Sequence, residues 1–376
     1  MTAGHTPKIL CVNPFGIGDV LFTTPLVRAI REAFPKSYLG YLCNRRTEVI
    51  LKNNPHLNEL IIYEKDDMLK LWRHSPWKGA RSLAQMLGRI RARRFDWVID
   101  LSLGERYSLI LRLLGVPKRV GFNYRKRGRF LTESLPIDGY HDAHVVEYYR
   151  HLLAFMGIRM PNGHSELPLD AKDRDWAQDW LHTHNLHHNP TLIGIVPAGG
   201  FSWGTHASYR RWGIQGFAAV GDALIGRFGA TVLLFGEKTD AATCAEVARS
   251  MRHPVIDISG QTTLGRFVAL MARLNLMICN DGGPLHLAVS QGIKTVSLFG
   301  PVDPLVYGPY PADPKRHRVV FRPEVWCRPC YRNFRLPPCP YERACLTQID
   351  PDDVIQACTQ LMETEHLPLG QQHDAS

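Results

Sequence analysis

Two glycine-rich turns carry acidic side chains at the ends of apolar runs, one near each end of the chain. The first turn, Phe15–Asp19, follows the apolar run Lys8–Val12. The second, Asp281–Pro284, follows the apolar run Leu276–Cys279. A strand that ends in such a turn and continues as a helix is where α/β proteins bind anions and place reactive side chains. The two turns therefore predict two similar domains that face each other across a cleft.

Asp19 is the candidate catalytic residue of the first turn. We expect it at the start of a helix, where the helix dipole stabilises a carboxylate in its ionised form. Gly16 and Gly18 just before it would let a substrate hydroxyl approach the backbone closely. An ionised carboxylate there can act as the general base for that hydroxyl. The same position also suits an Asp that only caps the helix, so both interpretations stay open.

The second turn has the features of a diphosphate site. Gly282 and Gly283 expose backbone N–H groups, and Pro284 fits the first turn of a helix whose dipole favours an anion. Asp281 precedes them directly. His286 either reaches the ligand or lies in the core. The alternative is a tight strand-to-helix turn that holds no ligand.

Two further positions fit a nucleotide. A loop of small residues, 197–201, is followed by Arg210, and a cation after such a loop suits diphosphate recognition. Glu237 stands between a predicted strand and helix, where it would contact ribose hydroxyls or cap the helix. No Gly-Lys-Ser/Thr follows the glycines, and no GxGxxG with a downstream acid occurs. A Walker-type nucleotidase and a nicotinamide dehydrogenase are therefore disfavoured.

Four cysteines fall within one segment, at Cys327, Cys330, Cys339 and Cys345. Four thiolates can hold zinc, but the second pair lacks the short spacing of ordinary zinc modules. Reduced thiols and one or two disulfides are the alternatives.

The chain alternates strands and helices, which predicts an α/β fold of doubly wound parallel sheets. In the first half we expect strands at 8–13, 38–43, 60–63, 96–101 and 119–122, and helices at 19–34, 45–52, 79–93, 104–114 and 142–157. In the second half we expect strands at 192–196, 231–235, 255–257, 276–279 and 295–299, and helices at 171–185, 214–228, 239–251, 263–273, 284–291 and 351–363.

The expected domains are an N-terminal acceptor-binding domain over 1–168 and a C-terminal nucleotide-sugar domain over 169–350. A helix at 351–365 is expected to pack back towards the N-terminal domain, and 366–376 is expected to be a disordered tail.

Charge is concentrated in the first domain. Residues 1–150 hold 25 Lys and Arg against 14 Asp and Glu, a net of +11, whereas residues 151–376 hold 20 against 21, a net of −1. A basic surface attracts nucleic acid, anionic lipid or an acidic glycolipid, although any single run can be only a solvated face. One run forms a candidate acceptor-binding patch: Arg125, Lys126, Arg127 and Arg129. No apolar run is long enough to span a bilayer, and no secretory signal opens the sequence, so we expect a cytoplasmic protein.

Taken together, these motifs resemble the bacterial lipopolysaccharide heptosyltransferases of glycosyltransferase family nine, whose fold is GT-B. The resemblance covers about residues 8 to 362 and rests most on Gly18–Leu21 with Thr24-Pro25, on Asp281–Ala288 and on Ser297–Pro304. It implies an ADP-heptose donor, inversion at the anomeric carbon and no required metal. Asp19 then matches the catalytic base, Asp281, Gly282, Gly283 and His286 the donor-binding turn, and Glu237 loosely a nucleotide contact. Where many members carry Lys, this chain has Arg210, which keeps the charge but changes its geometry.

The resemblance and the basic first domain together predict a nucleotide-sugar donor and an anionic, lipid-linked sugar acceptor. The enzyme would lie at the inner face of the inner membrane as a peripheral protein. The alternatives are a glycosyltransferase or epimerase that uses another nucleotide sugar, and a nucleic-acid-binding protein. No RNP or zinc-finger pattern supports the last of these, so no nucleic-acid partner is expected.

Overall fold

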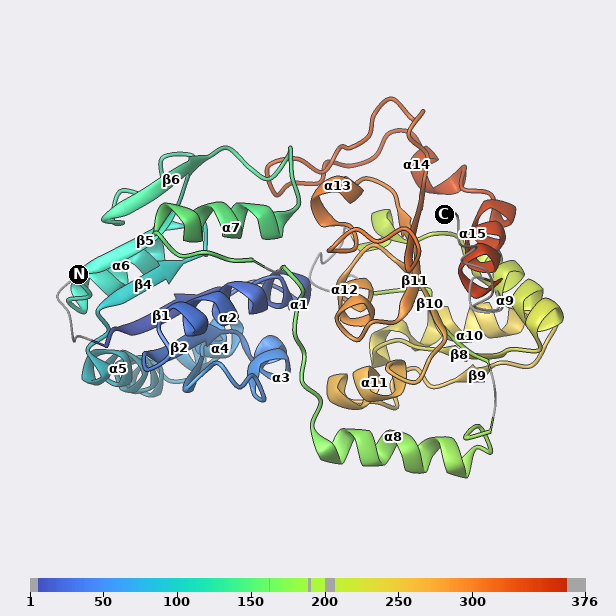
Figure 1. Cartoon of the computed structure of the whole chain (residues 1–376), viewed down its shortest axis with the longest axis horizontal. Helices are drawn as coiled ribbons and strands as arrows, with labels where there is room; N and C mark the ends of the chain where they lie inside the picture. The colour runs from blue at the N-terminus through green and yellow to red at the C-terminus, as the bar shows by residue number, and fades with distance from the viewer. Residues whose placement is uncertain (1–5, 162, 189–190, 200–206, 364–376) are drawn as a thin grey trace, which may run out of the picture. The chain divides into compact units, whose positions relative to one another are not determined.

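The computed structural model describes residues 6–161, 163–188, 191–199 and 207–363. The chain forms two compact units (Figure 1). The first unit runs to Asp170 and also includes Arg332–Arg335; the second unit comprises Ala171–Tyr331 and resumes at Leu336. Each unit has its own six-stranded sheet in which all the strand pairs are parallel. The expected α/β class is confirmed.

The sheet of the first unit has the strand order β3-β2-β1-β4-β5-β6. Its strands are β1 (Lys8–Val12), β2 (Tyr38–Cys43), β3 (Glu59–Ile62), β4 (Trp97–Asp100), β5 (Lys118–Tyr124) and β6 (Glu133–Ile137). Strand order reverses between β1 and β4, where Val12 is in register with Asp100. In doubly wound sheets ligands bind at the carboxyl ends of the strands on either side of this reversal.

The helices of the first unit are α1 (Ile17–Leu21), α2 (Thr24–Ala33), α3 (Glu48–Leu51), α4 (Lys65–His74), α5 (Pro76–Arg93), α6 (Glu105–Leu113) and α7 (Val145–Phe155), with a 3-10 turn η1 (Arg45–Thr47) before α3. The single helix expected over 19–34 is wrong, because α1 and α2 are separate. Pro25 has no N–H to continue the first helix, and the Thr23 hydroxyl lies 2.6 Å from the carbonyl oxygen of Val20.

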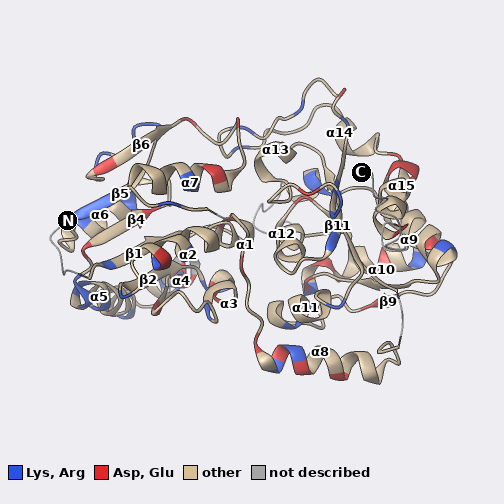
Figure 2. Cartoon of the chain, in the orientation of Figure 1, with Lys and Arg blue, Asp and Glu red and all other residues tan. Residues whose placement is uncertain are grey.

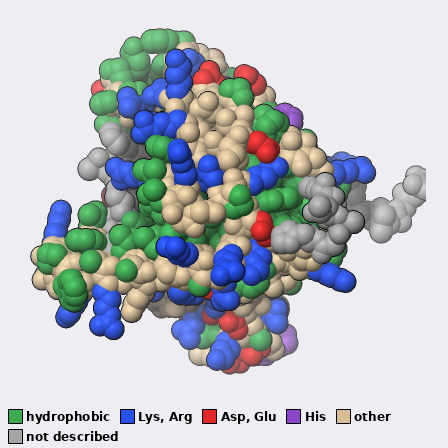
Figure 3. Space-filling view, turned by 90° about the vertical axis from the view of Figure 1, so that its left-hand side faces the viewer, with side chains coloured by type: hydrophobic (Ala, Val, Ile, Leu, Met, Phe, Trp, Pro, Cys, Tyr) green, Lys and Arg blue, Asp and Glu red, His purple; other side chains and the backbone are tan. Residues whose placement is uncertain are grey.

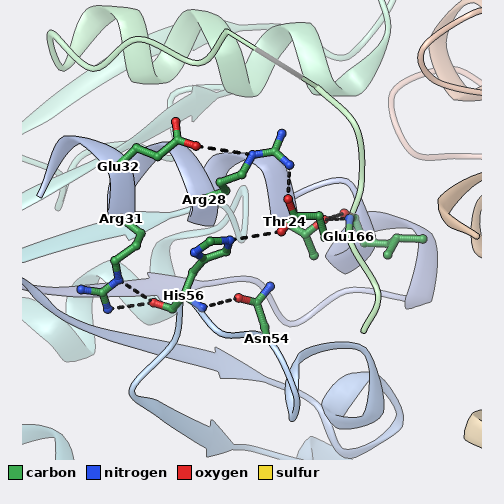
Figure 4. A network of polar contacts seen from close by, with 8 residues as sticks. Thr24, Arg28, Arg31, Glu32, Asn54, His56 and Glu166 are labelled. Carbon is green, nitrogen blue, oxygen red and sulfur yellow. Dashed lines mark hydrogen bonds and ion pairs between the residues drawn. The ribbon is translucent and has the colours of Figure 1, made fainter. Parts of the chain in front are cut away.

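The segment that follows α7 is fixed to the first unit by Glu166 (Figure 4). Its backbone N–H donates to Oγ1 of Thr24 at 2.8 Å. Its carboxylate pairs with the guanidinium of Arg28 and lies 3.2 Å from Nε2 of His56. The segment around Glu166 therefore packs on α2.

The second unit repeats the plan with the strand order β12-β11-β10-β7-β8-β9. Its strands are β7 (Leu192–Val196), β8 (Thr231–Leu234), β9 (Ile256–Asp257), β10 (Leu276–Asn280), β11 (Lys294–Phe299) and β12 (His317–Phe321). Its helices are α8 (Ala171–Thr183), α9 (Ile214–Phe228), α10 (Ala241–Ser250), α11 (Leu264–Met271), α12 (Gly283–Ser290), α13 (Pro304–Tyr307), α14 (Ala344–Thr347) and α15 (Pro351–Glu363), with a 3-10 turn η3 (Lys238–Asp240). Here the strand order reverses between β7 and β10.

Helix α15 contacts α9, β11 and β12, so it is part of the second unit. The helix expected at 351–365 packs on the second unit, because its apolar residues Val354, Cys358 and Leu361 join the core of that unit. The tail expected at 366–376 lies outside the described residues. Among the described helices, every one is too short or too polar to span a bilayer.

A short turn from the cysteine-rich segment belongs to the first unit. Arg332 and Arg335 exchange two backbone hydrogen bonds, and Asn333 and Phe334 between them have left-handed φ angles of 54° and 61°. The ring of Phe334 packs edge-on against Tyr124, with the ring centroids 5.3 Å apart. The turn therefore adds an aromatic side chain to the carboxyl end of β5.

Candidate functional site

Asp19 lies in α1, directly after β1, at the reversal of strand order in the first unit. It is the third residue of the helix, and its Oδ2 accepts a hydrogen bond from the N–H of Gly16 at 3.2 Å. The capping role that the sequence left open is therefore present, although Gly16 rather than Asp19 is the N-cap residue. Asp19 is partly exposed, so its carboxylate can cap the helix and still meet a substrate.

Two asparagines hold the turn that carries Asp19. The side chain of Asn13 donates to the Asp19 carbonyl at 3.1 Å and accepts from the N–H of Phe15 at 3.1 Å. The side chain of Asn44, at the carboxyl end of β2, donates to the Phe15 carbonyl at 2.5 Å. The turn is thus anchored to two neighbouring strands, which fixes the position of the carboxylate.

Tyr140 lies within electrostatic range of Asp19. Burial is the main cause that raises the pKa of Tyr140 well above its ordinary value, and the charges of Tyr149 and Asp19 add to it. Its ring packs against Tyr148 at 4.8 Å and against Phe334 at 5.4 Å between centroids. Tyr140, Tyr148 and Phe334 thus form an aromatic cluster in the same unit as Asp19, and Phe334 is too far from the other two in the sequence for a local pattern to predict it.

Asp100 is a second carboxyl at the same reversal of strand order. It ends β4, is buried, and accepts the N–H of Ser102 through Oδ1 at 3.0 Å. Burial raises its pKa to about 6, and the hydrogen bonds from Ser102 oppose that shift. An acidic residue directly after the apolar run Trp97–Ile99 is the signal that would have found it.

The predicted basic patch forms an exposed loop at the carboxyl end of β5. Arg125 and Lys126 have left-handed φ angles of 50° and 62°, and the N–H of Gly128 closes the loop on Oδ1 of Asn123 at 2.9 Å. The guanidinium of Arg125 lies 5.3 Å from the centroid of the Tyr124 ring. The Arg127 guanidinium lies over the same ring, whereas Arg129 pairs with Glu105 at 3.1 Å. This loop leaves the same edge of the sheet as the Asp19 turn.

In the second unit, Asp281 and Arg210 form a buried ion pair. Nε of Arg210 donates to Oδ2 of Asp281 at 3.0 Å, and its Nη2 contacts the same oxygen. Burial raises the pKa of Asp281, and the Arg210 charge opposes that shift. Among the described residues, no donor reaches Oδ1 of Asp281. Arg210 was predicted to contact the diphosphate, and its partner 71 residues away has no local signal in the sequence.

Gly282 adopts a backbone conformation that only glycine accepts readily, with φ 154° and ψ −171°. Gly283 and Pro284 then open α12, so the first N–H groups of that helix have no carbonyl partner within it. His286 is buried in α12. The Asp281–Pro284 turn has the geometry of an anion-binding helix N-terminus.

Asn280 joins this turn to the loop that follows β7, and the sequence analysis missed it. Its Nδ2 donates to the carbonyl of Pro197 at 2.9 Å, and its Oδ1 accepts the N–H of Trp212 at 2.9 Å. Both contacts lie at the reversal of strand order between β7 and β10. A polar residue that closes the buried run Leu276–Cys279 was the available signal.

Glu237 is exposed at the carboxyl end of β8, next to β7 in the sheet. It is the N-cap residue of η3, and its N–H donates to Oδ2 of Asp240 at 3.1 Å. Arg211 links the two neighbouring loops, because it donates to the Gly199 carbonyl at 2.9 Å and pairs with Asp240 at 3.3 Å. The structure thus brings Glu237, Arg210 and the Asp281 turn to the carboxyl edge of one sheet. Gly200 and Phe201 of the predicted loop lie outside the described residues.

The four clustered cysteines are all free thiols in the structure. Burial raises the pKa of the Cys345 thiol to about 11, and the nearby Cys330 adds to it. In the part of the chain that the structure describes, no three His, Cys, Asp or Glu side chains are arranged to hold a metal ion. The zinc interpretation therefore gains no support from the geometry.

Residues 81–336 match the family model for glycosyltransferase family 9 (heptosyltransferase). A curated relative is the lipopolysaccharide core heptosyltransferase OpsX of Haemophilus influenzae. It is 22% identical over 311 residues, which are 81% of this chain and 83% of the relative.

Two solved structures have the same fold. The family 9 glycosyltransferase from Veillonella parvula has a TM-score of 0.80 and 28% identity, and the match covers 95% of this chain and 98% of that one. The Escherichia coli ADP-heptose lipopolysaccharide heptosyltransferase II has a TM-score of 0.71 and 20% identity, with 96% and 100% covered. The expected GT-B fold is confirmed by these likenesses.

Proposed function

Because the chain belongs to glycosyltransferase family 9, the heptosyltransferase family, we propose that it transfers heptose from ADP-heptose to the inner core of lipopolysaccharide. The acceptor is a sugar linked to lipid A, and the enzyme works as a peripheral protein on the cytoplasmic face of the inner membrane. The observation that carries the proposal is the presence of one glycine-rich turn at the strand-order reversal of each sheet. One turn holds the carboxylate Asp19, and the other has the geometry of an anion site.

The second unit is the proposed donor site. The N–H groups of Gly282 and Gly283 bind the diphosphate, and the N-terminus of α12 favours its negative charge. The ion pair between Arg210 and Asp281 is close to neutral, so we give Arg210 mainly the role of fixing the turn. Glu237 is exposed on the loop that follows β8, and β8 is separated from β10 by β7 in the sheet. There its carboxylate can accept hydrogen bonds from the ribose hydroxyls.

The first unit is the proposed acceptor site, and Asp19 is its general base. The acceptor oxygen attacks the anomeric carbon from the side opposite the diphosphate, so the configuration inverts. A new bond forms between that oxygen and the anomeric carbon while the bond from the anomeric carbon to the diphosphate breaks. The hydroxyl proton moves to a carboxylate oxygen of Asp19, and ADP leaves with the electron pair of the broken bond. The N–H groups of the donor turn stabilise the charge that develops on the diphosphate, and we assign no step to a metal ion.

The basic loop after β5 supports an anionic acceptor. Arg125, Lys126 and Arg127 are exposed on the edge of the sheet that also carries Asp19. Arginine binds phosphate and carboxylate groups through paired N–H donors, which suits the charged sugars and phosphates of a lipopolysaccharide core.

Thermal unfolding of the full chain with a panel of nucleotide sugars tests the proposal. ADP-heptose is expected to raise the melting temperature, because a ligand at a hundredfold excess over its Kd adds about 2.7 kcal/mol to the free energy of unfolding. ADP alone should give part of this shift, and UDP- or GDP-sugars should give little. A larger shift with a UDP-sugar would replace ADP-heptose by another donor, and conversion of the donor without acceptor would indicate an epimerase.

A further inference from the structure

The helical hairpin of α4 and α5 has a one-sided composition that the proposed chemistry does not use. Over residues 65–93 the two helices contain eight Lys and Arg against two acidic residues, Asp66 and Asp67, both in the first turn of α4. Figure 2 shows the basic positions along α5. Helix faces that are exposed only to water usually carry both signs of charge, so this excess of positive charge is unusual for such a face.

Large apolar side chains are exposed where the two helices meet. Trp77, the second residue of α5, is 81% exposed, and Leu69 and Trp72 of α4 are 46% and 40% exposed. Trp72 packs on the backbone of Gly79, since a Cβ there would lie 2.8 Å from its ring. The hairpin is therefore held together by Trp72 and presents Trp77 to its surroundings.

Lys and Arg residues are distributed along both helices. Arg89 and Arg93, at the far end of α5, pair with Glu59 at 2.8 Å each. Lys70, Arg73, Lys78 and Arg81 lie within four residues of one of the two tryptophans in the sequence, and all four are exposed. Figure 3 views the side of the molecule on which α5 lies in Figure 1 and shows Lys and Arg side chains interspersed with hydrophobic ones.

We infer that the α4–α5 hairpin docks the enzyme on an anionic lipid surface. Tryptophan is favoured at the boundary between headgroups and acyl chains, and the cations beside it meet the lipid phosphates while their aliphatic stems cover apolar surface. The inference deepens the proposed function and rests on it for the identity of the membrane. A lipid-linked acceptor lies in a bilayer, so the enzyme has to bind at that bilayer to reach it. The hairpin belongs to the same unit as Asp19 and the basic loop after β5.

Co-sedimentation of the full chain with vesicles tests this surface. The vesicles are phosphatidylcholine alone, or phosphatidylcholine mixed with phosphatidylglycerol, without donor or acceptor. The wild type is expected to bind the anionic vesicles and to be released by salt. Lys78→Gln with Arg81→Gln should weaken binding by about fivefold for each cation removed, at about 1 kcal/mol each. Trp77→Ser should also weaken it severalfold, and the remaining binding should still depend on salt.

Matched controls lie in the second unit. Trp326 is 77% exposed, and Arg249 and Arg252 are exposed cations, so Trp326→Ser and Arg249→Gln with Arg252→Gln should bind like the wild type. The inference is overturned if the hairpin variants bind anionic vesicles as well as these controls do. It is also overturned if the wild type binds an oligonucleotide but not the vesicles. Because the assay contains no sugar, a failure of heptose transfer leaves the result standing, and transfer to a delipidated acceptor should be unchanged in Trp77→Ser.

Discussion

The Arg210 guanidinium and the Asp281 carboxylate meet in the interior of the second unit, where Nε donates to Oδ2 at 3.0 Å. A loop that follows β7 is thereby attached to the turn that follows β10. The pair explains how one sheet edge can present a glycine-rich turn in a fixed conformation. It also explains why Arg210, which the sequence predicts to bind the ligand, is instead paired with a carboxylate of the protein.

Removal of Arg210 should leave a buried carboxylate without its main partner. We expect Arg210→Met to lower the free energy of unfolding by about 3 to 5 kcal/mol in urea denaturation near neutral pH. Arg210→Met with Asp281→Leu should recover a large part of this loss, because the unpaired charge is gone. Equal losses in the single and double variants would show that the ion pair does not govern stability here.

Gly282→Ala should cost stability through the backbone rather than through a clash, because the nearest atom to an added Cβ, Cδ of Pro284, lies 3.9 Å away. A residue other than glycine at φ 154° is expected to lower the free energy of unfolding by about 1 to 3 kcal/mol. The same variant should lose most of the thermal shift with ADP. Gly226 in α9 is the matched control, since nothing lies within 4 Å of a Cβ there and its helical backbone accepts alanine. Gly226→Ala should stabilise by up to about 1 kcal/mol and keep the ADP shift.

Alanine variants of Asn280 and Asn275 distinguish a loss of stability from a loss of donor binding. Each accepts a backbone N–H, from Trp212 at 2.9 Å and from Leu192 at 2.8 Å, at opposite ends of β10. Each Asn→Ala variant should lose about 1 to 3 kcal/mol of stability. Only Asn280→Ala should weaken ADP binding in calorimetry, because only Asn280 holds the loop at the carboxyl edge. A similar loss of affinity in Asn275→Ala would contradict the assignment of the donor site.

Asp100 should make stability depend on pH. Its pKa is about 6 in the folded chain and near 3.8 in the unfolded chain, so between these values the folded state binds more protons. The free energy of unfolding should therefore fall as pH rises from about 4 to about 6, by roughly 3 kcal/mol at most, and then level off. Asp100→Asn should remove this fall and be more stable than the wild type at pH 8. Parallel pH profiles for the two proteins would contradict the burial of an ionisable group at this position.

Much of the fold could be predicted from the sequence, because strand and helix periodicity is a local property. The buried run Leu192–Val196 and the amphipathic segment Ile214–Phe228 have the bounds expected for them. Strands β6 and β12 and helices α4, α13 and α14 were not predicted. The Glu133–Ile137 strand contains a proline and is only half buried, so it lacks the apolar run typical of a parallel strand.

The two turns of the site could also be predicted, since glycine and acidic residues directly after an apolar run form a local sequence pattern. The partners of those turns could not. Arg210 meets Asp281, and Asn280 meets Trp212, only because β7 and β10 are neighbours in the sheet. Strand order is set by tertiary packing, so these contacts have no local signature.

Turnover of Asp19→Asn with ADP-heptose and a lipid A-linked acceptor tests the central claim most directly. The amide oxygen of Asn can still accept the Gly16 N–H, so the turn should keep its shape. The thermal shift with ADP should equal that of the wild type, whereas kcat should fall by about two to four orders of magnitude because the amide cannot take the acceptor proton. A variant that binds ADP normally and transfers heptose at the wild-type rate would contradict the account.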